Sequence, residues 1–317
     1  MKNDVQKDEL IEAFKSVRAY FLYATLFSAA LNCLMISPIL YMLLVYDRVI
    51  SSGSMETLAM LSLLLLLLVT SSGGFDWARS KLLIAVNVRT EKDLRLKVSK
   101  SAFRHTLATG NHIQSKQAMG DLINLRQFIT GSGVISIMDA PWVPIYIGVM
   151  FLFHPFFGVS AIIAALIMIL LAVVAQKSTA KRMSNANLLS MTAQASFGNN
   201  LRNTEVIHGM GMSQNIQDKD DALFSKASSE QAYASVNASR LAAISKAFRM
   251  LSQSFLLGLG AYLAVNGQIS PGMMIAGSLL LGRALAPIDM MVASWKSFID
   301  ARGQYERLSE ILGSYPE

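Results

Sequence analysis

The chain has 317 residues, of which 53% are hydrophobic and only 15% are charged, whereas a soluble domain carries about 25% charged residues. This balance and a mean hydropathy of +0.41 predict a membrane protein and argue against an ordinary soluble domain. The net charge of +7 does not indicate nucleic-acid binding, because basic residues in a membrane protein gather on its cytoplasmic side. A single cysteine, Cys33, excludes an intrachain disulfide.

Residues 1–19 are expected to form a cytoplasmic N-terminal segment. They are not a secretion signal, because residues 1–18 carry four acidic and four basic side chains before the first apolar run. Residues 20–317 then read as an all-α membrane domain with six apolar spans, since about 20 apolar residues are enough to cross the hydrocarbon core. The expected spans are 20–46, 55–77, 131–153, 156–175, 248–265 and 271–285.

The distribution of lysine and arginine predicts the orientation. The N-terminal tail has four, residues 78–130 have ten, residues 176–247 have eight and the tail after Val292 has three, while the short connections contain Arg48 alone. Positive residues stay inside, so both termini and both long connections are expected in the cytoplasm of a multi-pass protein.

The two long connections contain no proline and few glycines, and their apolar residues recur among charged ones at helical spacing. We therefore expect spans two to five to continue into the cytoplasm as two helical hairpins, the first arm (about 78–130) and the second arm (about 176–247). Their tips are expected at 107–115, with Leu107 and His112, and at 197–203, with Phe197 and Arg202. A carrier that binds solute at the bilayer midplane does not need such arms, whereas a permease driven by a separate motor does.

Three segments resemble one branch of the ABC exporters. They are 46–58 between the first two spans, the Asp139-Ala-Pro-Trp-Val-Pro-Ile-Tyr146 block of the third span, and 205–212 after the second tip. These segments are similar to the transmembrane domain of type I secretion exporters for proteases, lipases and adhesins. The resemblance implies a homodimeric, ATP-driven exporter of an unfolded protein in a bacterial inner membrane, with a periplasmic adaptor and an outer-membrane channel as partners.

No G-x-x-x-x-G-K-[ST] loop occurs in the sequence, so we expect ATP and Mg²⁺ to bind a nucleotide-binding domain outside this chain. No catalytic, cofactor or metal site is expected in the chain itself, and whether it counts as an enzyme stays open. A scaffold or sensor derived from a permease, and a secondary transporter without a motor, remain as alternatives.

Four residues are candidates for function within or near the membrane. Asp139 and Arg283 are expected inside spans, where charges usually face a cavity or a partner, so both could line the export path. Either could instead be structural: Asp139 could satisfy backbone groups freed by Pro141 and Pro144, and Arg283 could pair with Asp289. Asp47 and Arg48 lie at the first periplasmic turn, which is either an adaptor docking point or simply a solvated turn.

Overall fold

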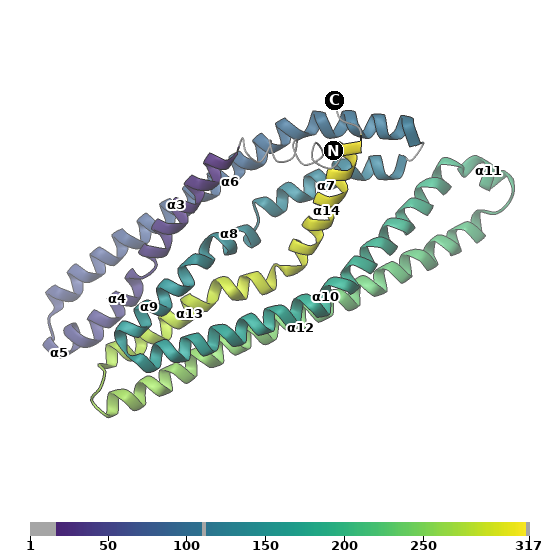
Figure 1. Ribbon diagram of the computed structural model, residues 1–317. Helices are drawn as coiled ribbons and strands as arrows, with labels where there is room; N and C mark the ends of the chain where they lie inside the picture. The colour runs from purple at the N-terminus through teal and green to yellow at the C-terminus, as the bar shows by residue number, and fades with distance from the viewer. Residues whose placement is uncertain (1–16, 110–111, 315–317) are drawn as a thin grey trace.

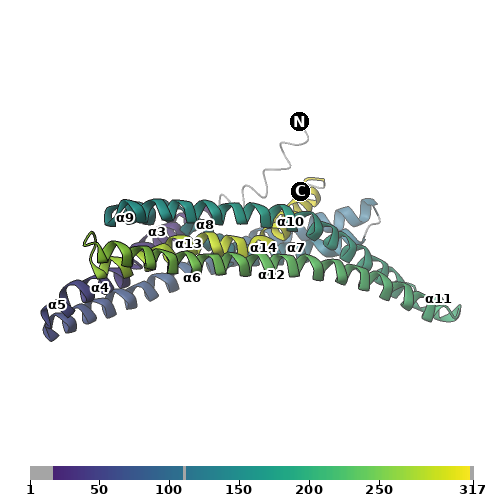
Figure 2. The ribbon, with the colours of Figure 1, turned by 90° about the horizontal axis from the view of Figure 1, so that it is seen from below.

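The computed structural model describes residues 17–109, 112–314 of the chain. Most of the expected N-terminal segment 1–19, part of the first tip (110–111) and the last three residues lie outside the described residues. Every regular element in the described part is a helix, and these helices run roughly side by side in an elongated bundle (Figures 1 and 2). The expected all-α architecture is confirmed.

Six segments of the described chain are long and apolar enough to cross a membrane, which confirms the expected number of spans. The first consists of α3 (Arg18–Leu34), α4 (Ser37–Leu44), the π-helical turn η1 (Val45–Val49) and α5 (Ile50–Ser52). The second span is part of α6 (Met55–Thr109). The third consists of α8 (Ser132–Asp139), η2 (Ala140–Trp142) and α9 (Val143–Phe153). The fourth, fifth and sixth spans are parts of α10 (Pro155–Arg202), α12 (Ser213–Val265) and α13 (Pro271–Ala293), in that order. The remaining helices are α7 (His112–Ile129), α11 (Thr204–Gly209) and α14 (Trp295–Ser314).

Prolines explain where the spans are interrupted and where they are not. The first span is divided at Met35 and Ile36, just before Pro38 in the first turn of α4. The third span changes to a short 3-10 helix at residues 140–142, where Pro141 stands at its start. The sixth span was expected to end at residue 285, yet α13 continues through Pro287 to Ala293, because a proline removes one helical hydrogen bond without always ending the helix.

The long connections are helical, as the sequence predicts. Helices α6, α10 and α12 contain 55, 48 and 53 residues and are therefore about 70–80 Å long, more than twice the ~30 Å thickness of the hydrocarbon core. The third span is the exception, because α7 is separated from α8 by a break at Thr130 and Gly131. Figure 1 shows the second arm diverging from the first towards α11.

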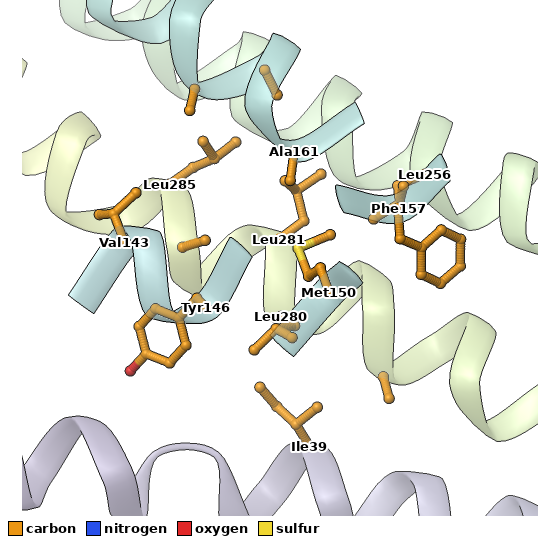
Figure 3. Close-up of a cluster of buried hydrophobic side chains, with 14 of the residues drawn as sticks. Ile39, Val143, Tyr146, Met150, Phe157, Ala161, Leu256, Leu280, Leu281 and Leu285 are labelled. Atoms are coloured by element: carbon orange, nitrogen blue, oxygen red, sulfur yellow. The ribbon is translucent and has the colours of Figure 1, made fainter. Parts of the chain in front are cut away.

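Two separate hydrophobic clusters hold the bundle together. The first lies where α9, α10, α12 and α13 meet, with Ile39 added from α4, and Figure 3 shows part of it. Alanines at 161, 164, 165, 276 and 284 let these helices approach closely, as is typical of membrane helices, for which packing replaces the hydrophobic driving force. The second cluster joins the first arm to α14 through Val86, Leu94, Leu122 and Leu308.

Polar bonds add specific connections between the arms and α14. Asp121 on α7 is almost fully buried and accepts two hydrogen bonds of 2.7 Å from the guanidinium of Arg307 on α14. These bonds raise the pKa of Arg307 above its ordinary value, so its charge is fixed at any working pH. Asn187 on α10 donates to Asp300 on α14 at 2.8 Å, which ties the base of the second arm to the same helix.

Candidate functional site

Five polar residues from four helices form a cluster between the spans. We call Ser28 and Asn32 of α3, Arg79 of α6, Asp139 of α8 and Tyr146 of α9 the polar cluster; all but Asp139 are buried, and the side chain of Asp139 is 20% exposed. Tyr146 belongs at the same time to the first hydrophobic cluster, and Figure 3 shows its hydroxyl pointing away from the apolar side chains. The polar cluster therefore adjoins the apolar core.

Asn32 is the centre of this network. Its Nδ2 donates to Asp139 Oδ1 at 2.7 Å, and its Oδ1 accepts the hydroxyl of Tyr146 at 2.9 Å. The Tyr146 hydroxyl also lies 3.0 Å from the backbone oxygen of Asn32. One amide thus connects the first and third spans by using both its donor and its acceptor.

Arg79 supplies the positive charge of the cluster. Its Nη1 donates to Ser28 Oγ at 3.0 Å and lies 3.5 Å from Asp139 Oδ1, while its Nη2 donates to Asp76 Oδ1 at 2.6 Å. Its Nε has no hydrogen-bond partner among the residues that the structure describes. Charges between membrane helices are costly unless paired, so the contact between Arg79 and Asp139 offsets part of the cost of placing both side chains there.

From the sequence alone, Arg79 is only one of the ten basic residues of the first arm. An available signal was its spacing from Asp76, because residues three apart on a helix face the same side and can pair. The pair directly follows an apolar run without charges and so stands at the end of a span.

Arg283, the second path candidate, is an electrostatic neighbour of the Tyr146 hydroxyl, and this hydroxyl donates to Asn32, which is bonded to Asp139. The structure thus brings the two candidates into one neighbourhood. The suggested pairing of Arg283 with Asp289 is wrong: Asp289 Oδ2 accepts from Nε of Arg249 on α12 at 3.1 Å. Sequence spacing within one helix does not reveal a partner on a neighbouring helix.

Asp47, near the end of the first span, is bonded to the start of the sixth span. Its carboxylate accepts from Ser270 Oγ at 2.5 Å and from the backbone N–H of Gly272 at 2.8 Å, both at the first turn of α13. A Cβ at position 272 would come within 2.6 Å of the backbone oxygen of Leu43, so glycine is required for this approach. Asp47 is therefore more than a residue of a solvated turn, whereas its neighbour Arg48 is exposed.

The first tip is placed by the helix ends. Helix α6 ends at Thr109 and α7 begins at His112, so the chain reverses inside the expected interval 107–115. Leu107 is 86% exposed on α6, whereas the side chain of His112 lies outside the described part.

The second tip lies further along the chain than expected. Phe197 and Arg202 belong to the last turns of α10, and the chain reverses over residues 203–212, with α11 inside the reversal. Gly198 does not interrupt α10, because a helix tolerates one glycine at about 1 kcal/mol. The reversal instead uses Gly211, whose φ of +69° is in the left-handed region.

No group of three or more metal-ligating side chains gathers in the described part of the chain. What the structure presents is a multi-pass helical membrane domain with a charged network between its spans and helices that run far beyond them. The chain belongs to the ABC transporter transmembrane region family, which matches residues 21–286.

Curated relatives agree with the branch that the sequence suggested. The chain is 36% identical over 96% of its length to the type I secretion system ATP-binding protein PrsD of Rhizobium meliloti, and it covers 52% of that protein. It is 23% identical over 97% of its length to the leukotoxin translocation ATP-binding protein LktB of a Pasteurella haemolytica-like strain and to that of Mannheimia haemolytica, and it covers 44% of each. The resemblance to type I secretion exporters is confirmed. The chain spans about half the length of the curated relatives it matches.

Proposed function

We propose that this chain is the transmembrane part of an ATP-driven type I secretion exporter that moves an unfolded protein across the bacterial inner membrane. The observation that carries the proposal is the length of α6, α10 and α12, which extend far beyond a bilayer. Long rigid helices can transmit a movement made outside the membrane to the spans. The names of the relatives, which combine secretion or translocation with ATP binding, support the same function.

The arms point into the cytoplasm in this proposal, and their tips contact nucleotide-binding domains that bind ATP and Mg²⁺. The abundance of lysine and arginine on both arms supports this orientation. Exposed apolar side chains at the tips are suited to a protein contact: Leu107 on α6, and Val206 and Met210 at α11, are each more than 60% exposed.

Two copies of the chain form the working unit in this proposal, with the polar clusters along the export path. Asp139 and Arg283 would present charge to a polypeptide that carries both polar and apolar side chains. A periplasmic adaptor and an outer-membrane channel complete the system. Arg48, exposed beside the structural Asp47, is a charged residue of the first turn that is available to an adaptor.

Two measurements test the proposal. Deleting the gene in the bacterium that produces the chain should abolish secretion of at least one extracellular protein, and re-expression should restore it. A photo-crosslinker at Val206 should join the chain to an ATPase, whereas one at Arg48 should not. Unchanged secretion would refute the exporter and favour a scaffold, and a Val206 crosslink to a periplasmic protein would reverse the orientation.

A further inference from the structure

A polar cavity of about 410 Å³ lies between the first arm, the start of the third span and α14. Its volume is within the range of ligand sites, although its lining differs from the mostly apolar lining of such sites. Amide, hydroxyl and carboxylate side chains dominate the walls, and among the residues that the structure describes only Phe128 adds a large apolar side chain. The polar side chains are Asn124, Gln127, Ser132, Ser294, Ser297, Asp300 and Gln304.

Two helices place this cavity at one boundary of the membrane. The third span begins at Ser132, and the sixth ends at Ala293, one residue before Ser294. The third span (132–153) and the sixth (271–293) are each just over 30 Å long, about the thickness of the hydrocarbon core. The cavity is therefore at the arm side of the spans. Asp139 of the polar cluster is two helical turns, or roughly 10 Å, further along α8 from Ser132.

The cavity offers hydrogen-bonding groups that are not used within the protein. Among the described residues, no side-chain hydrogen bond engages the amides of Asn124, Gln127 or Gln304, and the first two are exposed. One carboxylate oxygen of Asp300, Oδ1, already accepts from Asn187. No lysine or arginine of the described residues lines the cavity, so an anion is not the ligand that fits it, and one phenyl ring is too little for an apolar molecule.

A side-chain amide donates and accepts at once, as a peptide group does. An unfolded polypeptide repeats its N–H and C=O groups along its length whatever its side chains are. Amides and hydroxyls can therefore hold successive segments of many sequences without selecting among them. Apart from Asp300 the lining is uncharged, so most charged side chains can pass without a strong attraction that would halt them.

We propose that this cavity binds the main chain of an extended polypeptide as it enters the membrane on its way to the polar cluster. This inference rests on the proposed function, since it assigns the place where the exported protein is first held. Gln127 on α7 and Gln304 on α14 line the cavity from two different helices, and in this proposal they carry the binding.

The test uses the full chain in lipid nanodiscs and a fluorescent, unstructured peptide, with binding followed by anisotropy. A competitor of scrambled sequence should displace the probe as well as the parent peptide does, while a backbone N-methylated competitor should be about tenfold weaker or worse. The double variant Gln127→Leu, Gln304→Leu should weaken binding by about tenfold. The matched control Gln231→Leu changes an exposed glutamine on the second arm and should leave binding unchanged.

Each contrary result overturns a defined part of the inference. Equal competition by the N-methylated peptide would refute main-chain recognition, and undiminished binding by a correctly folded double variant would refute the cavity as the site. Absence of peptide binding by a chain whose deletion abolishes secretion would overturn the inference alone. Secretion that survives the deletion would overturn the proposed function, and the inference with it.

Discussion

Replacing Asp47 by alanine separates its structural role from a docking role. The change removes two hydrogen bonds at the first turn of α13 and leaves the Gly272 N–H without its partner. A lost bond to a charged acceptor and an unsatisfied donor cost about 1–3 kcal/mol. On the scale of about 2–4 °C for each kcal/mol, the unfolding midpoint should fall by about 2–12 °C.

The assay is thermal unfolding of the purified chain in nanodiscs, followed by intrinsic fluorescence. Asp47→Asn should lose less than Asp47→Ala, because an amide oxygen still accepts while the favourable charge at the helix N-terminus is lost. Arg48→Ala is the matched control and should not change the midpoint, since Arg48 is exposed. An Asp47→Ala midpoint equal to that of the control would show that the reasoning about this cap is wrong.

Three further perturbations probe the other contacts. Gly272→Ala should lower the unfolding midpoint at least as far as Asp47→Ala does, because the new Cβ would lie 2.5 Å from the Asp47 carboxylate oxygen. An unchanged midpoint would mean that the two helices are further apart here than this distance implies. Asn32→Leu removes the side-chain hydrogen bonds to Asp139 and Tyr146, although Asp139 keeps Arg79 and the tyrosine hydroxyl keeps the backbone oxygen of residue 32. Unfolding should therefore become easier by about 2–4 kcal/mol, and Cys33→Ser, an exposed neighbour, serves as control. Arg307→Lys should destabilise the contact between the first arm and α14 by about 1–3 kcal/mol, because lysine cannot make both bonds to the buried carboxylate. The pKa of Arg307 is raised in the folded chain, so the contribution of Arg307 to stability is fully present below its unfolded pKa. The stability difference between wild type and the lysine variant should therefore not change in neutral or mildly alkaline solution. A pH-dependent difference in that range would contradict this expectation.

Local chemistry was sufficient to predict the elements of the fold. A span requires about 20 apolar residues, and a long polar segment without proline but with helical periodicity can hardly be anything but helix. The positions of the prolines marked the interruption of the third span, although Pro287 did not end the sixth. The helix ends were harder to predict. Phe197 was expected at the second tip but lies within α10, which continues through Gly198. Whether a glycine ends a helix depends on the backbone conformation at that glycine.

The partners of the charged residues could not be predicted. Asp139 and Arg283 were recognisable as functional candidates because charges are rare inside spans. Arg79 was not, because the sequence alone does not tell on which side of the membrane boundary a residue at the end of a span lies. That Asn32, an unremarkable polar residue in an apolar run, is the centre of the network is a property of how α3, α8 and α9 pack.

By itself, the sequence determined that this chain spans a membrane six times, that its spans extend into helical arms, and that it resembles type I secretion exporters, because these properties depend on composition, periodicity and short motifs. Only the tertiary structure decided that Asp47 caps α13, that Asp289 pairs with Arg249, and that amides from α7 and α14 line one cavity. Each of these joins residues that are far apart in the chain, and such contacts are fixed by helix packing rather than by any local pattern.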